Sequence, residues 1–335
     1  MKALVLEDVG KLVYKDVPTP APQAGEVLLH IKACGICSSD FDRCLKTGTY
    51  HFPTIPGHEF AGQVVVVGDG VDSALIGRRA AVFPLLPCRK CDQCRIEAYA
   101  RCRNYNYFGS RCDGAFAEYI AVPEWNLQLF DDALDYSVAA LCEPAAVAYH
   151  SVAAADVCPG MGVCIIGTGT IGILAGMWAR ERGCGVTFVS RNERKNEFLR
   201  RLGFNSFLAS GESDAEAFPI VLECVGSDMS LAEAVQRVST AGHVVLVGNP
   251  DGDKNLSRKR YWKILREEVT VKGVWNSSYT SSNNEWHKVL LELTAKQGLF
   301  SQLITSKFPL SDGIAVFDAI RGSEKLEIKG MFVNE

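Results

Sequence analysis

The sequence predicts an α/β protein in which a doubly wound parallel sheet domain accompanies a β-rich domain. From about residue 160, short apolar strands alternate with helices, a pattern typical of a parallel sheet covered by helices. Residues 1–150 instead carry short apolar runs separated by Gly and Pro, which favour an irregular β-rich domain. The 335 residues are also too many for one simple core, so two domains are expected.

The individual elements follow from the spacing of the apolar residues. Strands are expected in the first part at 28–33, 63–67 and 79–83. In the second part the expected order is strand 163–166, helix 171–182, strand 186–189, helix 193–202, strand 221–225, helix 231–238 and strand 244–247. The pattern is mixed after about 276, and the Ser/Asn-rich stretch 276–284 is expected to be a loop.

Composition argues against several partners and locations. The net charge of −4 gives no reason to expect binding to nucleic acid or to an anionic membrane. No apolar run reaches the roughly 18 residues that a membrane span needs. The segment Met1–Glu7 reaches an acidic residue too early for a signal peptide. We therefore expect a cytoplasmic protein, and in that reducing compartment its 13 cysteines indicate metal binding rather than disulfides.

Four closely spaced cysteines form the first candidate metal site. They are separated by two, two and seven residues, which suits a closed tetrahedral zinc site with a structural role. Five basic side chains around them would favour the thiolate form. Free surface cysteines and an iron–sulfur cluster are the alternative interpretations. The predicted ligands are Cys88, Cys91, Cys94 and Cys102, and the basic residues are Arg89, Lys90, Arg95, Arg101 and Arg103.

A second candidate metal site combines three separate segments of the chain. Cys37 lies in Cys34–Asp40, His58 follows Gly57, and Glu143 follows Cys142. A thiolate, an imidazole and a carboxylate suit a catalytic zinc site that keeps one position open for water or an alcohol. Zinc lowers the pKa of a bound alcohol, and the resulting alkoxide can expel a hydride. A lone histidine is more often structural, so this interpretation depends on the other motifs of the chain.

A glycine-rich turn directly after the predicted strand 163–166 indicates a Rossmann-type dinucleotide site. The first glycine permits the tight turn, the second lets a pyrophosphate approach the helix N-terminus, and the third packs helix on strand. The predicted cofactor-binding residues are Gly167, Thr168, Gly169, Thr170, Ile171 and Gly172, with Val225, Gly226, Val247 and Gly248 near the later strand ends.

The end of the following strand favours NADP(H) over NAD(H). An NAD-dependent enzyme usually carries Asp or Glu there for the ribose 2′-hydroxyl, whereas this chain has Ser190 and Arg191. Ser190 can hydrogen-bond a 2′-phosphate, and Arg191 can pair with it through a charge-assisted bond. The alternative interpretation is that Arg191 is a solvated turn residue and that either cofactor is used.

Together these motifs resemble the zinc-containing medium-chain dehydrogenases over essentially the whole chain. Segments 82–88, 108–119 and 263–273 resemble the galactitol-1-phosphate 5-dehydrogenases, a polyol dehydrogenase branch of that family. The resemblance implies two zinc ions per chain and a homodimer, with a tetramer as the alternative. It further implies a GroES-like catalytic domain at 1–151 and 276–335, with a zinc lobe at about 86–104, and a Rossmann domain at 152–275.

The resemblance also implies roles for individual residues. Cys37, His58 and Glu143 resemble catalytic zinc ligands, and Glu59 resembles an acid that ligates zinc in some members or exchanges with Glu143 during turnover.

Three neighbours of Cys37 complete this set. Ser39 resembles the hydroxyl that passes the substrate proton outward, and Asp40 resembles the acid that orients the zinc-bound histidine. Asp42 is a departure, because simple alcohol dehydrogenases have a relay histidine at this position. The outer part of the proton path is therefore left open.

The expected function is hydride transfer between NADP(H) or NAD(H) and a secondary alcohol of a polyol or polyol phosphate such as galactitol 1-phosphate. The alternatives are a dehydrogenase or ketose reductase for unphosphorylated sugar alcohols or diols, and a cofactor-binding protein without catalysis. Arg111 is the candidate contact for a substrate phosphate, with a surface ion pair as the alternative. Other residues expected near the substrate or the nicotinamide are Tyr50, His51, Phe108, Ser110 and Trp275.

Overall fold

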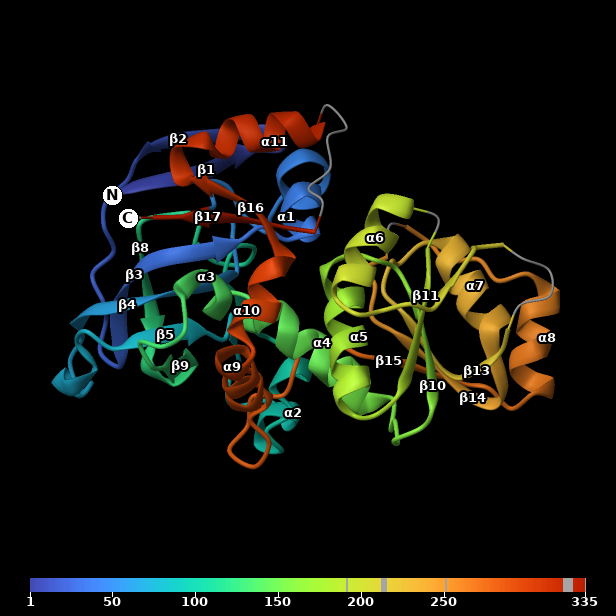
Figure 1. Ribbon diagram of the computed structural model, residues 1–335. Helices are drawn as coiled ribbons and strands as arrows, with labels where there is room; N and C mark the ends of the chain where they lie inside the picture. Colours follow the sequence, from blue (N-terminus) through green and yellow to red (C-terminus); the bar gives the residue numbers. More distant parts are fainter. Residues whose placement is uncertain (191, 212–215, 251, 322–327, 335) are drawn as a thin grey trace. The chain divides into compact units, whose positions relative to one another are not determined.

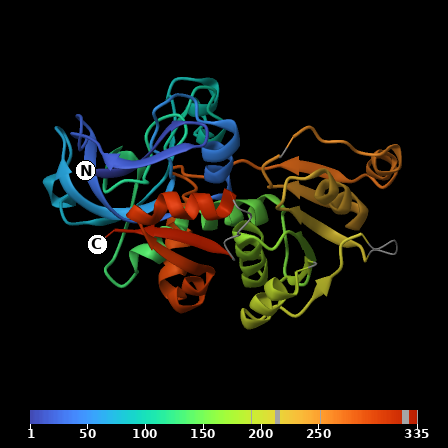
Figure 2. The ribbon, with the colours of Figure 1, turned by 90° about the horizontal axis from the view of Figure 1, so that it is seen from above.

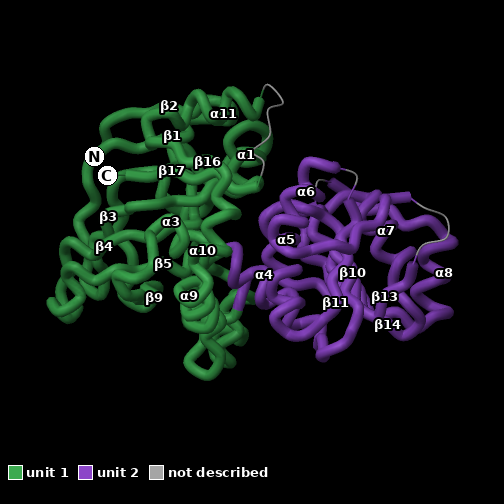
Figure 3. Tube along the Cα trace, viewed as in Figure 1, with its two compact units in different colours: residues 1–143, 278–335 green, residues 144–277 purple. Residues whose placement is uncertain are grey.

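The computed structural model describes residues 1–190, 192–211, 216–250, 252–321 and 328–334 (Figure 1). The chain forms two compact units (Figure 3). Unit 1 comprises Met1–Glu143 and Ser278–Glu335, and unit 2 comprises Pro144–Ser277. The first and the last strand of the chain therefore belong to the same unit, as the blue and red ribbons of Figure 2 show.

Unit 2 contains a six-stranded sheet in the order β12-β11-β10-β13-β14-β15. All neighbouring strands in it are parallel. This is the strand order of a Rossmann sheet, in which ligands bind at the carboxyl edge where the order reverses, here between β10 and β13. The predicted fold class is thus confirmed. The strands are β10 (Gly162–Ile166), β11 (Gly185–Val189), β12 (Phe207–Leu208), β13 (Phe218–Glu223), β14 (Val238–Leu246) and β15 (Thr270–Gly273).

Helices connect these strands. The strand predicted at 221–225 lies earlier, in β13, because the chain leaves the sheet after Glu223 and turns at Gly226, whose φ is +86°. Buried apolar side chains of the strands, such as Cys164, Val221 and Val244, form the core of the unit. The helices are α4 (Cys142–Ala154), which begins in unit 1, and α5 (Thr170–Glu181), α6 (Glu193–Arg201), α7 (Asp228–Arg237) and α8 (Arg258–Arg266).

Unit 1 is built around a seven-stranded sheet in the order β16-β17-β3-β4-β5-β9, with β8 also paired to β3. The C-terminal strand β17 is antiparallel to β3, with Met331 opposite Gly35. This pairing brings the end of the chain next to Cys34–Asp40, the segment that carries Cys37. The strands are β3 (Glu26–Gly35), β4 (Glu59–Val67), β5 (Arg79–Val82), β8 (Tyr119–Pro123), β9 (Leu127–Phe130), β16 (Ile304–Pro309) and β17 (Lys329–Val333).

Two small sheets and several short helices complete unit 1. The sheets pair β1 (Lys2–Asp8) with β2 (Lys11–Asp16), and β6 (Leu85–Leu86) with β7 (Asn106–Tyr107). The helices are α1 (Ser38–Asp42), which continues as a π-helical turn at Arg43–Thr47, α2 (Asp92–Arg95), α3 (Tyr136–Ala139), α9 (Glu285–Ala295), α10 (Gln297–Phe300) and α11 (Gly313–Arg321). Within the described ranges, every helix is too short or too polar to cross a membrane.

Candidate functional site

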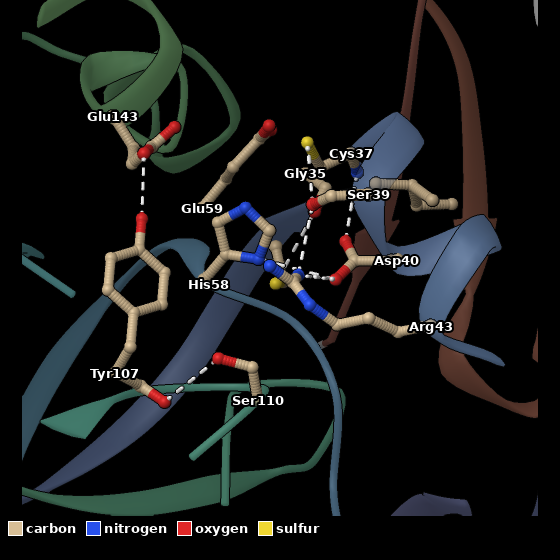
Figure 4. A network of polar contacts seen from close by, with 12 residues as sticks. Gly35, Cys37, Ser39, Asp40, Arg43, His58, Glu59, Tyr107, Ser110 and Glu143 are labelled. Atoms are coloured by element: carbon tan, nitrogen blue, oxygen red, sulfur yellow. Dashed lines mark hydrogen bonds and ion pairs between the residues drawn. The ribbon is translucent and has the colours of Figure 1, made fainter. Parts of the chain in front are cut away.

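Three potential metal ligands meet in unit 1 where β3 ends, α1 begins and β4 begins (Figure 4). Cys37 caps the N-terminus of α1, and Glu59 is the first residue of β4. One ligand atom each from Cys37, His58 and Glu59 lies within 4.8 Å of the others, and the histidine and the glutamate are buried. A thiolate, an imidazole and a carboxylate this close together fit a zinc ion that retains an open position.

Glu143 lies beside this cluster, at the start of α4. Its Oε1 accepts a hydrogen bond of 3.1 Å from the Tyr107 hydroxyl, which fixes the carboxylate (Figure 4). Burial raises the pKa of Glu143 to about 7, and the charge of Glu59 adds to this rise while His58 opposes it. In this structure the ligand atoms of Cys37, His58 and Glu59 lie together, whereas Glu143 is hydrogen-bonded to Tyr107. Which carboxylate ligates the metal stays a prediction.

Lys329 is a member of the site that the sequence did not indicate. Its Nζ donates to both carboxylate oxygens of Glu59, at 2.9 and 2.7 Å, and to the Ile36 carbonyl at 3.2 Å. The two side chains are only 4% and 2% exposed. The glutamate beside the metal cluster is therefore buried together with a partner of opposite charge.

Asp40 connects two of the potential ligands. Its Oδ1 lies 3.3 Å from His58 Nδ1, and its Oδ2 accepts a hydrogen bond of 3.0 Å from the Cys37 backbone. Burial opposes the charged form of Asp40, but His58, Arg43 and the Cys37 N–H outweigh it and hold the pKa of Asp40 below its ordinary value. A carboxylate on Nδ1 leaves Nε2 of His58 for a metal.

Ser39 and its neighbours lie on the first turns of α1. The Ser39 hydroxyl donates to Cys37 Sγ at 3.2 Å and accepts from Arg43 Nη1 at 2.9 Å (Figure 4). Asp42, at the position of the relay histidine, is ion-paired with the exposed Lys46 at 2.9 Å. The sequence did not single out Arg43. An assignment of helix to residues 38–42 would have indicated it, because residues four apart share a helix face.

Arg111, the predicted contact for a substrate phosphate, lies against two tyrosine rings. Arg111 stacks on Tyr50 and Tyr105, with its guanidinium carbon 4.1 and 4.4 Å from the two ring centres, and donates to the Tyr50 hydroxyl at 3.0 Å. No carboxylate among the described residues pairs with it, so the structure gives no support to a surface ion pair.

The other residues predicted near the substrate or the nicotinamide range from buried to exposed. Phe108 is 4% exposed and packs edge-on against Phe60 in the core of unit 1, which makes it a packing residue. Ser110 is also buried, 3.5 Å from the Tyr107 carbonyl. His51 Nδ1 lies 3.1 Å from both Pro53 O and Thr54 Oγ1. Trp275 is 53% exposed in unit 2.

The four-cysteine loop gathers its sulfur atoms in one place. The Sγ atoms of Cys91 and Cys94 are 3.6 Å apart, and those of Cys88 and Cys94 and of Cys91 and Cys102 are 4.0 Å apart. Tetrahedral zinc with metal–sulfur bonds of about 2.3 Å requires about 3.8 Å between sulfurs, so the loop fits zinc. All four cysteines belong to one cluster.

Backbone N–H groups favour the thiolate form of Cys88 and Cys91 in this loop, whereas burial raises the pKa of Cys94 to about 12. Hydrogen bonds from the backbone of Arg103 and Cys94 lower the pKa of Cys91 to about 6. The side chain of Arg103 instead forms two hydrogen bonds with Asp92, at 2.6 and 2.7 Å, and Arg89 stacks on Trp125. At Cys88 and Cys91 the largest effects on the thiol pKa therefore come from the backbone and not from the basic side chains that the sequence analysis considered.

The glycine-rich turn of unit 2 has the shape of a dinucleotide cradle. Gly167 directly follows β10 with φ of +112°, and a Cβ on Gly172 would lie 2.1 Å from the Gly167 carbonyl oxygen. A Cβ on Gly169, which caps α5, would meet no atom within 4 Å. Open space at a helix N-terminus lets a pyrophosphate reach the N–H groups. Thr168 lies in the same turn, and Thr170 and Ile171 are the first two residues of α5.

Glu223 joins the other predicted cofactor residues at the end of β13. It is buried, and its Oε1 accepts from the N–H groups of Val225 and Gly226, both at 2.8 Å. Its carbonyl accepts from Val247 and Gly248 at 2.8 and 3.0 Å. The sequence did not indicate this organising role of the glutamate.

The cofactor-selecting position follows β11. The Ser190 hydroxyl accepts from the Asn192 N–H at 3.3 Å, and Asn192 caps α6. Arg191, predicted to pair with a 2′-phosphate, lies outside the described residues.

A Rossmann unit, a GroES-like β-rich unit and two cysteine-containing clusters define a zinc-type dehydrogenase. Residues 23–132 match the alcohol dehydrogenase GroES-like domain, and residues 170–296 match the zinc-binding dehydrogenase family. The chain is 32% identical to galactitol 1-phosphate 5-dehydrogenase of Escherichia coli K12 over 92% of both proteins. It is 31% identical to sorbitol dehydrogenase of Bacillus subtilis over 84% of this chain and 83% of that protein.

Solved structures agree with these relationships. The crystal structure of galactitol-1-phosphate dehydrogenase from Escherichia coli matches with a TM-score of 0.91 and 30% identity over all of both chains. A zinc-binding dehydrogenase from Sinorhizobium meliloti, bound to NADP, matches with a TM-score of 0.89 and 27% identity over 99% of each chain. The chain belongs to the zinc-dependent alcohol and polyol dehydrogenase family, which confirms the predicted resemblance and the prediction of an enzyme.

Proposed function

We propose that the protein transfers a hydride between NADP(H) and a secondary alcohol of a polyol or polyol phosphate, with two zinc ions per chain. The cluster of Cys37, His58 and Glu59 beside Glu143 carries this proposal, since it offers zinc an open position for a hydroxyl. The names of two relatives, for galactitol 1-phosphate and sorbitol, support a polyol as the substrate. A cytoplasmic location is part of the proposal, because 13 free cysteines suit a reducing compartment.

The residues of unit 1 have separate tasks in this reaction. Zinc held by Cys37, His58 and a glutamate would supply Lewis acidity that lowers the pKa of the substrate hydroxyl. Asp40 holds Nδ1 of His58 and so orients the ring. The hydroxyl of Ser39, beside Cys37 Sγ, can accept the substrate proton while it releases its own.

The preference for NADP(H) rests on the end of β11. Ser190 stands where an NAD-dependent enzyme usually has an acid, and the chain has no carboxylate at 190–192. A carboxylate at this position would repel a 2′-phosphate, whereas a hydroxyl and the neighbouring arginine can bind it.

A phosphorylated substrate is supported by Arg111. Its guanidinium contacts the rings of Tyr50 and Tyr105 and donates to the Tyr50 hydroxyl and the Tyr105 carbonyl. It has no carboxylate partner among the described residues, and a guanidinium has five N–H groups, so N–H groups remain for an anion. An Arg111→Ala variant should raise KM for a phosphorylated polyol at least about tenfold and leave KM for the unphosphorylated polyol unchanged. Equal effects on both substrates would remove Arg111 from the phosphate role.

A substrate panel tests the proposed function. Polyols, ketoses and their phosphates should each be assayed on zinc-loaded protein with NADP(H) and with NAD(H). We expect turnover of at least one polyol or polyol phosphate, with kcat/KM about tenfold higher for the 2′-phosphorylated cofactor. A preference for NADH would contradict the cofactor part, and absence of turnover across the panel would contradict the substrate class.

A further inference from the structure

Arg43 lies one helical turn beyond Ser39, as the first residue of the π-helical turn that continues α1 (Figure 4). The guanidinium Nη1 donates a hydrogen bond of 2.9 Å to Ser39 Oγ and lies 3.5 Å from Asp40 Oδ1. The Arg43 side chain is 24% exposed. A long, rotatable side chain is thus held against the one hydroxyl that the mechanism uses.

The hydrogen bond with Arg43 fixes the role of the Ser39 oxygen. A hydroxyl has one hydrogen and two lone pairs, whereas a guanidinium has only donors. Because Arg43 occupies one lone pair of Ser39 Oγ, the hydroxyl hydrogen must point elsewhere, and it points to Cys37 Sγ at 3.2 Å. The positive charge beside the oxygen also makes this hydroxyl a stronger donor.

We propose that Arg43 is a positioning residue that holds the Ser39 hydroxyl toward the Cys37 cluster, where the substrate oxygen would bind. This inference rests on the proposed function, because Ser39 needs positioning only if it serves a reacting oxygen. Arg43 cannot continue the proton path, since its guanidinium stays charged and has no acceptor. Asp42, in the place of a relay histidine, is ion-paired with the exposed Lys46 and makes no contact with Ser39 that would hold its hydroxyl.

A purely structural role for Arg43 would act through Asp40 instead. The guanidinium lies 3.5 Å from that fully buried carboxylate, which in turn contacts His58. If Arg43 acted only through Asp40, its loss would weaken the contact that orients His58 and would lower the zinc content. This effect would be the same whether or not the Ser39 hydroxyl is present. The two routes therefore predict different results when Ser39 is also changed.

A double-mutant cycle with Arg43→Met and Ser39→Ala distinguishes the positioning of Ser39 from a structural role through Asp40. We expect Ser39→Ala to lower kcat about 100-fold and Arg43→Met about tenfold, with KM for the polyol little changed. In the Ser39→Ala background, Arg43→Met should cost less than about threefold, because its target is gone. A full tenfold loss in both backgrounds, or a fall in zinc content of Arg43→Met, would overturn the proposal.

Controls and a readout independent of turnover complete the test. Lys46→Met removes a cation from the same helix without touching Ser39 and should keep wild-type kcat, while Arg43→Lys should recover part of the loss because it retains a charged donor. Crystal structures should show the Ser39 hydroxyl within hydrogen-bond distance of Cys37 Sγ in the wild type but not in Arg43→Met. An unchanged rotamer in Arg43→Met would overturn the positioning role. The comparison of crystal structures tests the positioning role of Arg43 without any measurement of activity. Absence of turnover across the substrate panel would contradict the proposed function but not this positioning role.

Discussion

The buried pair of Lys329 and Glu59 shows how a single residue supports the metal cluster from outside the ligand set. The lysine donates to both oxygens of the carboxylate, and both side chains are almost fully buried. Removal of one partner from such a pair leaves an uncompensated charge, which costs more than the intact pair contributes. The stability of unit 1 and the state of the cluster are therefore linked through Lys329.

A Lys329→Met variant should lose about 3 kcal/mol of unfolding free energy, because Glu59 would remain buried without its partner. Denaturant unfolding of the zinc-loaded protein measures this change. Lys307→Met is the matched control, since Lys307 is exposed on the neighbouring strand β16, and its effect should stay within about 0.5 kcal/mol. A Lys329→Met protein as stable as the control would mean that Glu59 does not depend on this lysine.

At this scale, the sequence could predict residues whose chemistry lies within one short segment. The cysteine spacing and the segment around Cys37 are of this kind, since the spacing itself carries the information. Lys329 could not be predicted, because it reaches Glu59 only through the pairing of β17 with β3, far apart in sequence. Phe108 was expected near the substrate, whereas tertiary packing places it against Phe60.

The strand–turn–helix element from β10 to α5 shows how glycines act in different ways within one turn. Gly172 is required by the fold, because its Cα faces the Gly167 carbonyl, whereas the space beside Gly169 is empty of protein atoms. The first requirement concerns packing, and the second concerns access for a ligand.

Alanine substitutions at Gly172 and Gly169 should therefore affect different properties, the first the stability of the fold and the second the affinity for the cofactor. Gly172→Ala places a Cβ 2.1 Å from a carbonyl oxygen and should lower the unfolding free energy by about 2 kcal/mol. Gly169→Ala, at a φ of −86° that alanine accepts, should leave the stability of the cofactor-free protein unchanged. Its dissociation constant for NADPH should rise at least about tenfold, measured by titration of nucleotide fluorescence. Unchanged affinity of the Gly169 variant would contradict the cradle.

Elements with strong local signals were predicted well, and those defined by turns less so. The strands at β10, β11 and β14 and the helices at α5 and α6 overlap their predicted ranges, since their apolar periodicity is clear. The strand at β13 was predicted too late, because Cys224 and Val225 are apolar but belong to the turn that Glu223 organises. Apolar character alone does not distinguish the end of a strand from such a turn.

At the scale of the whole molecule, we infer a homodimer formed through the outer strand of the unit 2 sheet. β15 is the last strand in the sheet order, and all four of its residues are exposed. Val271 and Trp275 are 42% and 53% exposed, so this open sheet edge carries apolar side chains that strand pairing with a second copy would cover.

Light scattering should therefore give twice the mass of the chain. A Val271→Lys variant should shift the protein toward a monomer, because a charged edge residue opposes strand pairing. Val66→Lys, at a similarly exposed position of unit 1, should remain dimeric. A monomeric wild type, or a Val271→Lys variant that assembles like the wild type, would remove this interface.

The measurement that tests the central claim most directly is zinc content together with turnover, for the wild type and for Cys37→Ser. The account predicts two zinc ions per chain in the wild type, one held by each cysteine-containing cluster. Cys37→Ser should keep its fold and one zinc ion but lose turnover of the polyol about 100-fold or more, since Lewis-acid assistance is gone. A Cys37→Ser protein that binds two zinc ions, or that turns over substrate at the wild-type rate, would contradict a catalytic metal at this cluster.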